Sequence, residues 1–274
     1  MGDLPPWLFP PAARLHNTQT RTHKMPVSVL YLGDTSLQGA AAYLAGLIHR
    51  AGWALDYVPS HLPANAGLFA LPRSLYVLSD YPASRLSPPL QQRLVQAVAA
   101  GSGLLMIGGW ESYHGCGGDW DQSAVAAALP VEISRTDDRV NCDQPALVRY
   151  VQDHPAVEGL PWISRPPCIG GFNRFRSKAD SQLILETQRF RAIRDGEDFR
   201  FKPVGSDPLL VVGTHGQGRV AALATDVAPH WVGGLVDWGE GRVAAQAPGA
   251  EAVEVGDLYA QFFQQLLAWT AMRH

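Results

Sequence analysis

The sequence predicts an α/β protein with a mainly parallel β-sheet, followed by a β-rich excursion in the second half. Over roughly the first 130 residues, short continuous apolar runs alternate with amphipathic segments, which is the pattern of right-handed βαβ units. The apolar runs show no polar alternation, as expected for strands that are buried on both faces. After this point the runs alternate with polar residues, and hairpin signals replace the helices.

The elements of the first half follow from apolar periodicity and from helix start and stop signals. Continuous apolar runs predict strands at residues 27–33, 54–58, 74–79 and 103–107. One helix is expected at 37–51, and a second begins at Pro88, the favoured first position for proline. Asp34, after the first strand, is interpreted as a helix cap. This order is typical of a doubly wound, flavodoxin-like layer, whose ligands bind at the carboxyl ends of the strands.

Short strands and turns dominate the second half. Candidate strands lie at residues 130–134, 146–150, 182–186, 189–193 and 199–202, and Asp195-Gly196 is a hairpin signal. Residues 209–214 and 220–225 form another predicted hairpin. The Gly-rich, acidic stretch 233–256 is interpreted as a long surface loop, and Asp257 begins a final amphipathic helix.

The composition excludes several classes of protein. Of 274 residues, 46% are hydrophobic and only 17% are charged, with a net charge of −3, so no basic field indicates a nucleic acid or an anionic membrane as partner. Three scattered cysteines are too few for a disulfide framework, and a reducing cytoplasm is the expected location. The apolar runs are too short to span a bilayer.

A flexible, proline-rich tail is expected at residues 1–25, before a single domain at 26–274. Four prolines fall in its first eleven residues, and it lacks the charged and apolar regions of a secretory signal. Met25 directly precedes the first strand, so the native start could lie there. In the alternative, Trp7, Leu8 and Phe9 dock on a neighbouring subunit.

The segment 108–120 (GGWESYHGCGGDW) is the densest candidate for a binding site. It follows the fourth predicted strand and combines five glycines with aromatic and polar side chains, as expected for the rim of a pocket. The alternative is a loop folded over the sheet with its aromatic rings as a lid. The predicted ligand-binding residues, here and at neighbouring strand ends, are Asp80, Gly108, Gly109, Trp110, Ser112, Tyr113, His114, Trp120 and Trp231.

A second candidate is TDVAPHW at residues 225–231, after the last apolar strand. Asp226 and His230 could hydrogen-bond there, which either orients the imidazole for acid–base chemistry or only fixes the turn. No HxH or HExxH pattern is present, and the sequence predicts no metal and no cofactor. A mixed site from Asp226, His230, His114 and Glu111 would need the fold to bring these residues together. The basic stretch 165–202 is interpreted mainly as a solvated sheet face.

Four segments carry a resemblance to a known family. VSVLYLGD at the first strand, GLLMIGGWESYHG at the fourth, LPVEI at 129–133 and ATDVAPHW at 224–231 resemble a family of uncharacterised bacterial proteins named Putative glutamine amidotransferase. This family lies within the class I glutamine amidotransferase-like superfamily, and the resemblance covers residues 26–272. It implies a flavodoxin-like three-layer α/β sandwich and a cytoplasmic protein.

The resemblance also implies a Cys–His–Glu glutaminase site, from which this sequence departs. Amidotransferases carry the nucleophile at a strand-to-helix elbow of the form G-x-C-x-G, whereas the fourth strand here continues into Gly108, Gly109 and Trp110. Cys116 lies further along the loop, and His230 alone has a position like that of the family's histidine. Without the elbow thiolate, hydrolysis of glutamine by this mechanism is not expected.

Three functions remain open from the sequence. The first is an amidotransferase-like protein without glutaminase activity that binds a small polar ligand. The second is a hydrolase or transferase with Cys116 as nucleophile, His230 as base and Asp226 or Glu111 as orienting group. The third is a non-enzymatic, assembly-forming protein. A homo-oligomer is compatible with all three.

Overall fold

The computed structural model describes residues 27–271, and the predicted tail at 1–25 lies outside the described residues. A single nine-stranded sheet runs through this part of the chain, in the order β2-β1-β3-β4-β11-β10-β9-β6-β7. Its strands are β1 (Ser28–Gly33), β2 (Ala54–Val58), β3 (Leu75–Ser79), β4 (Gly103–Ile107), β6 (Arg139–Tyr150), β7 (Cys168–Asn173), β9 (Gln182–Asp195), β10 (Asp198–His215) and β11 (Gly218–Leu223).

The sheet has a parallel half and an antiparallel half. The strands β2, β1, β3, β4 and β11 are parallel neighbours, and β10, β9, β6 and β7 continue the sheet in antiparallel fashion. The predicted mixed α/β class is confirmed. The expectation of a mainly parallel sheet holds only for one half, because the predicted excursion extends the same sheet.

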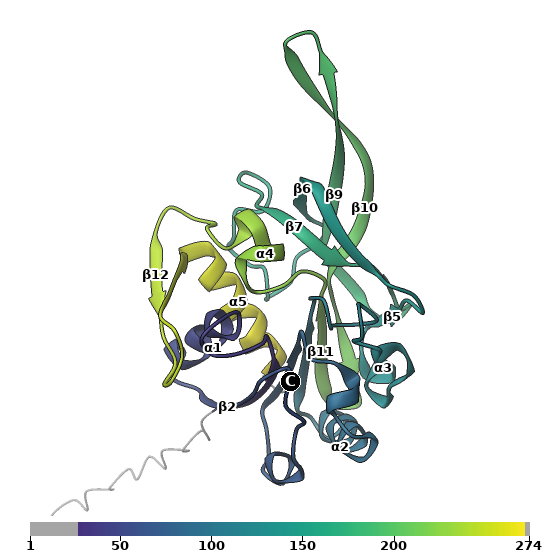
Figure 1. Cartoon of the computed structure of the whole chain (residues 1–274), viewed down its shortest axis with the longest axis vertical. Coiled ribbons are helices and arrows are strands. Elements are labelled where there is room, and N and C mark those ends of the chain that lie inside the picture. The colour runs from purple at the N-terminus through teal and green to yellow at the C-terminus, as the bar shows by residue number, and fades with distance from the viewer. Residues whose placement is uncertain (1–26, 272–274) are drawn as a thin grey trace, which may run out of the picture.

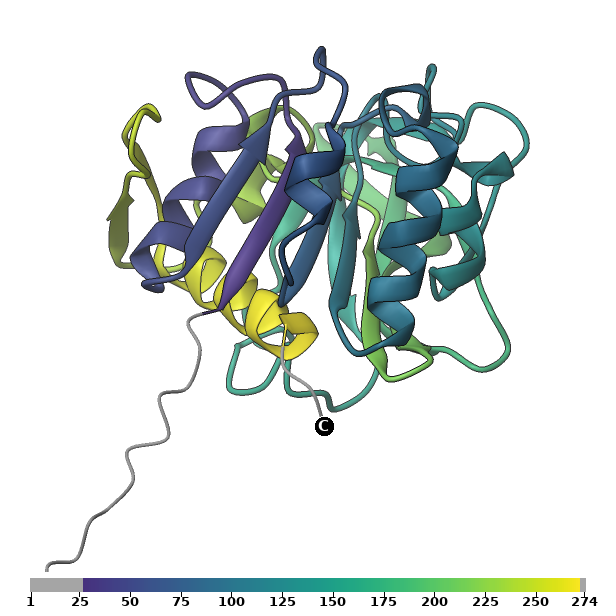
Figure 2. The same ribbon diagram turned by 90° about the horizontal axis from the view of Figure 1, so that it is seen from below.

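Helices cover both faces of the parallel half. Figures 1 and 2 show α1 (Ala41–Arg50) and α5 (Asp257–Ala271) on one face and α2 (Pro88–Ala99) on the other. The central strand β1 is buried on both faces, because its residues Val29, Leu30, Tyr31 and Leu32 have no exposed surface. No helix within residues 27–271 has the length and apolar character needed to cross a lipid bilayer.

Smaller elements complete the antiparallel half. The strand β5 (Val131–Ile133) pairs with β8 (Phe175–Ser177), and α3 (Ala124–Ala128) packs against α2. The three strands predicted at 182–186, 189–193 and 199–202 are merged into β9 and β10, which form a long two-stranded arm with its turn at Asp195-Gly196 (Figure 1).

The prediction of a surface loop at 233–256 is wrong. This segment forms the two-stranded sheet of β12 (Arg242–Ala245) and β13 (Val253–Gly256), which contacts α1 and α5. The indole of Trp238 is buried against Trp162, at 4.4 Å between ring centroids, and its N–H donates to the carbonyl of Arg165. Trp238, Ala245 and Val255 thus belong to the main hydrophobic core, which the glycines and acids of the segment conceal in the sequence.

Candidate functional site

Three aspartates meet at the carboxyl-terminal edge of the parallel strands. Asp34 follows β1, Asp80 follows β3 and Asp226 follows β11, and Asp34 and Asp226 are buried. Burial, and then the charges of Asp226 and Asp80, raise the pKa of Asp34 well above its ordinary value. Burial, and then the charge of Asp80, raise the pKa of Asp226 to about 7. Such shifted carboxyls mark this edge as a candidate site.

The interpretation of Asp34 as a helix cap is wrong. The helix α1 begins only at Ala41, and no side chain caps it. The carboxylate of Asp34 instead accepts hydrogen bonds from the hydroxyls of Tyr31 and Ser79. The side chain of Asp34 therefore faces the strand edge rather than the helix.

Asp80 organises the loop that follows β4. Its carboxylate accepts hydrogen bonds from the amides of Trp110 and Glu111, and its own amide donates to the hydroxyl of Ser112 at 2.8 Å. The Ser112 hydroxyl in turn donates to the carbonyl of Ile107 at 2.6 Å. Asp80 adopts a left-handed backbone conformation with φ of 48°, which is uncommon for a residue other than glycine. The loop is thus wrapped around the Asp80 carboxylate.

Asn173 and Asp138, which no sequence pattern singled out, bind the same loop from the side of the antiparallel strands. The Asn173 amide group accepts from the N–H of Gly109 and donates to its carbonyl, at 2.9 and 3.1 Å. It also donates to Asp138, whose carboxylate accepts the amides of His114 and Gly115. The one signal for Asn173 in the sequence is a polar residue at the end of an apolar strand.

Three aromatic residues predicted to bind ligand are packed in the core. Tyr113, Trp120 and Trp231 are each no more than 1% exposed. The Tyr113 hydroxyl lies 3.0 and 3.1 Å from the carbonyls of Met106 and Leu223, and so bridges β4 and β11. The indole N–H groups of Trp120 and Trp231 donate to Tyr81 and Asn141, both at 2.7 Å. These rings fasten the loops to the sheet.

The accessible part of the loop carries a small polar cluster around Trp110. The indole of Trp110 is 44% exposed, the guanidinium of Arg139 lies 4.4 Å above its ring centroid, and the exposed His230 ring lies at 6.3 Å. Cys116 is exposed beside it, and its amide donates to the Trp110 carbonyl. Burial, and then the Asp80 charge, raise the pKa of Glu111, which is partly exposed. We call these five residues the Trp110 cluster.

The structure does not join the predicted catalytic residues by hydrogen bonds. Asp226 accepts the amides of Val227 and Ala228, and within residues 27–271 no hydrogen bond connects it to His230. The Cys116 sulfur likewise has no hydrogen bond to any histidine in the described part of the chain. A nucleophile–base–orienting relay of these residues is therefore absent in this conformation.

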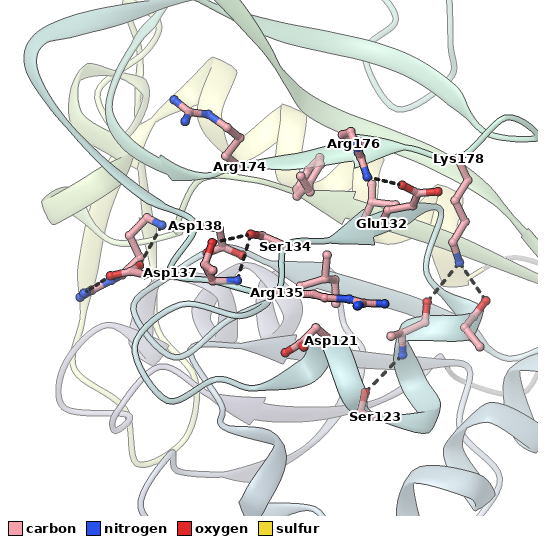
Figure 3. A pocket seen from close by; sticks show the side chains of 17 residues that line it. Asp121, Ser123, Glu132, Ser134, Arg135, Asp137, Asp138, Arg174, Arg176 and Lys178 are labelled. Carbon is pink, nitrogen blue, oxygen red and sulfur yellow. Dashed lines mark hydrogen bonds and ion pairs between the residues drawn. The ribbon is translucent and has the colours of Figure 1, made fainter.

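The described part of the chain also forms a hollow of about 980 Å³ (Figure 3). Its walls come from residues 121–139 and 174–178, and Arg139 lines it as well as covering Trp110. Four of its five cations are already engaged: Arg139 pairs with Asp137, Arg174 with Asp207 and Arg176 with Glu132, and Lys178 donates to the carbonyls at the end of α3. Arg139 thus connects the hollow to the Trp110 cluster.

One grouping in the described residues has the donor set for a divalent cation. The ligand atoms of His114, Asp119 and Asp121 lie within 4.8 Å of one another, and His114 Nδ1 is 2.9 Å from Asp121. His114, predicted to bind ligand, therefore lies beside two carboxylates rather than at the strand edge. The mixed grouping of His114 with Glu111, Asp226 and His230 is not the one that forms. That the protein works without a metal stays a prediction.

Comparison with known proteins places the fold in a family. Residues 69–243, more than half of the chain, match the family described as Putative glutamine amidotransferase. No curated protein matches the chain. Two solved structures share the fold, the cytoplasmic proteins STM3548 from Salmonella typhimurium and STM1381 from Salmonella typhimurium LT2, with TM-scores of 0.66 and 0.65. They are 22% and 24% identical, over 88% and 89% of this chain and 98% and 99% of theirs. This protein therefore belongs to the Putative glutamine amidotransferase family.

Proposed function

We propose that this protein does not hydrolyse glutamine and instead binds a small polar metabolite at the carboxyl-terminal edge of its parallel strands. The observation that carries the proposal is the end of β4, where an amidotransferase places its cysteine. A Cβ atom on Gly108 would lie 1.9 Å from the carbonyl oxygen of Ala224, and one on Gly109 would lie 2.6 Å from the carboxylate of Asp80. Neither position has room for a side chain, and a G-x-C-x-G elbow that begins at Gly108 places Trp110, which has no nucleophilic group, at the position of the cysteine.

The backbone donors of this edge support the same conclusion. Acyl transfer needs free N–H groups aimed at the oxygen that becomes negatively charged. The amides of Trp110 and Glu111 point instead at the carboxylate of Asp80, which occupies the position of such an anion. A developing oxyanion would have to displace the partly exposed carboxylate of Asp80, which already accepts from both donors.

The Trp110 cluster indicates the chemistry of the ligand. It offers an exposed indole ring with the guanidinium of Arg139 over it, and the carboxyl of the next residue, Glu111, is partly exposed. A sugar or an amino-acid derivative matches these groups, because its hydroxyl or amino groups would bind Glu111 and its carboxylate would bind Arg139. Arg139 is now bonded to the exposed Asp137 at 2.7 and 2.9 Å, and a ligand carboxylate would take the place of Asp137. A flavodoxin-like layer, a cytoplasmic location and no cofactor are part of this proposal.

We expect purified protein to release no steady ammonia from glutamine, and to bind at least one compound from a panel of amino acids, their derivatives and sugars. Binding is measured by thermal shift and then by calorimetry. The variants Trp110→Ala and Arg139→Ala should weaken it by about tenfold or more, since each removes one contact. Leu71→Ala, a change at a 60% exposed apolar residue, serves as the control. Steady ammonia release would contradict the proposal.

The exposure of Cys116 beside Arg139 and Trp110 favours a second candidate, a hydrolase that uses this thiol. Our proposal expects the wild type and Cys116→Ser to hydrolyse esters and amides at the same background rate. Cys142 and Cys168 are internal controls for alkylation by iodoacetamide, because burial raises the pKa of both thiols. Hydrolysis that is lost in Cys116→Ser and in His230→Ala would establish the second candidate instead.

A further inference from the structure

The arm formed by residues 189–204 extends away from the body of the protein (Figure 1). Within the described residues, β9 and β10 pair only with each other beyond Gln188. The base of the arm lies against residues 140–144, which line a small hollow together with residues 189–191, and the amide of Ala192 donates to Gln144 at 2.9 Å. An isolated two-stranded hairpin is at best marginally stable in water. The arm therefore needs a surface to pack against.

The register gives the arm one apolar face and one basic face. Phe199 pairs with Arg194, Phe201 with Ala192 and Pro203 with Phe190, and directly paired residues lie on the same face. Phe199 and Phe201 are 62% and 64% exposed. The alternate residues form the other face, which carries three bases and two acids: Arg191, Ile193, Asp195, Asp198, Arg200 and Lys202, with Arg200 paired to Asp195. An amphipathic arm with two exposed phenylalanines is a typical docking element.

A second hollow on the same chain is complementary to this arm. It encloses about 810 Å³ and is lined by residues 150–164 apart from Val151, Gln152 and Ala156. Trp162 forms its rigid part, since this ring packs against Trp238 and Phe262, and Ile163 at its rim is 82% exposed. This exposed fraction is higher than that of any other large apolar residue in the described part of the chain.

The charges of the two surfaces are opposite. The arm carries five arginine and lysine residues against three acidic ones, whereas the lining of the hollow has Asp153 and Glu158 and neither arginine nor lysine. His154 adds no positive charge near neutral pH, because burial, and then the charge of Arg219, lower its pKa to about 4. The hollow is thus apolar inside and negative overall.

We propose that the arm of one copy of this protein docks in the hollow of a second copy. The face with Phe199 and Phe201 contacts the hollow at Ile163, and Arg194, which is paired with Phe199 and so lies on the same face, lies against Asp153 and Glu158. The arm and the hollow lie on the same chain, are both apolar, and carry opposite charges. A second copy of this protein is therefore the occupant that they favour, because one contact covers both surfaces. A two-fold arrangement in which both arms are exchanged makes this contact twice.

The test compares a double arm variant, Phe199→Asp with Phe201→Asp, with a hollow variant, Ile163→Asp. Both change exposed side chains, so the fold should persist, and circular dichroism checks this. We expect the wild type to have twice the chain mass or more by light scattering at tens of micromolar. Each variant should weaken self-association by about 100-fold or more, as expected for the loss of buried aromatic or aliphatic contacts. Leu71→Asp, at an exposed apolar residue on another segment, should leave it unchanged.

Mixing the two variants separates this contact from any other interface. The arm variant keeps an intact hollow and the Ile163→Asp variant keeps an intact arm, so an equimolar mixture restores one arm–hollow contact. Sedimentation of a fluorescently labelled arm variant should therefore show a heavier species only when the hollow variant is added. A monomeric wild type, an arm variant with wild-type mass, or a mixture of folded variants that does not associate would each overturn the proposal.

Discussion

Replacing Gly108 by alanine should lower the free energy of unfolding by about 3 kcal/mol or more, as expected when a methyl group is forced into a closed backbone contact. The added Cβ would lie 1.9 Å from the Ala224 carbonyl oxygen and 2.8 Å from the Asn173 side-chain oxygen. Both belong to segments that cannot retreat easily, because the amide of Gly108 donates to Leu223 and Thr225 at 2.8 and 3.1 Å. The measurement is urea-induced unfolding followed by tryptophan fluorescence.

Gly39→Ala is the matched control for this substitution. An added Cβ there would meet its nearest atom, the Ser36 hydroxyl oxygen, at 3.6 Å, which is ordinary van der Waals contact. We expect its free energy of unfolding to stay close to that of the wild type. Equal stabilities for the Gly108→Ala and Gly39→Ala proteins would mean that the end of β4 can accept a side chain, and the main support for a missing nucleophile would be lost.

Asp226→Asn should stabilise the protein above neutral pH and flatten its pH dependence. The pKa of Asp226 is about 7 in the folded protein against an ordinary value of 3.8, so the folded state binds this proton more tightly. Its contribution to stability is fully present below about pH 4 and is lost as the pH rises through about 7. At about pH 8 the asparagine variant should therefore be more stable than the wild type by about 3 kcal/mol, to an order of magnitude.

Asparagine keeps an oxygen that can accept the amides of Val227 and Ala228, so the turn after β11 is preserved. Urea unfolding at about pH 5 and about pH 8 gives the comparison. Glu254→Gln, at an exposed carboxylate on β13, controls for the loss of a surface charge. A difference between Asp226→Asn and wild type that does not grow with pH would show that Asp226 is already ionised and accommodated in the folded protein.

The parallel half of the fold could be predicted closely from the sequence, whereas β10 could be predicted only as two separate strands, at 199–202 and 209–214. Strands buried on both faces are continuous apolar runs, and the predicted strand 103–107 coincides with β4. By contrast, Pro203, Gly205 and Pro208 interrupt the pattern of β10 and indicate a loop. The structure accommodates them at register shifts between β9 and β10, where a strand can continue without regular pairing.

The location of the candidate site could also be predicted, but the orientation of its side chains could not. Asp80 and the segment after β4 do lie at the carboxyl-terminal strand edge. Whether an aromatic ring in a glycine-rich loop turns inward depends on distant partners, such as Asn141 for Trp231 and Tyr81 for Trp120. These partners are 90 and 39 residues away along the chain, respectively, so local patterns carry no information about them.

The position of β11 between β4 and β10 has a consequence for how the chain folds. One edge of β4 remains unpaired until β11 pairs with it. This pairing requires that the whole segment from Gly108 to Gln217, which includes most of the antiparallel half, has been synthesised. Such non-local pairing is slow, and an apolar strand edge that waits for it is prone to aggregation. A nascent chain that ends before Gly218 thus presents an unpaired β4 to the cell, and the whole strand-end site forms late in folding, with Asp226 its last member.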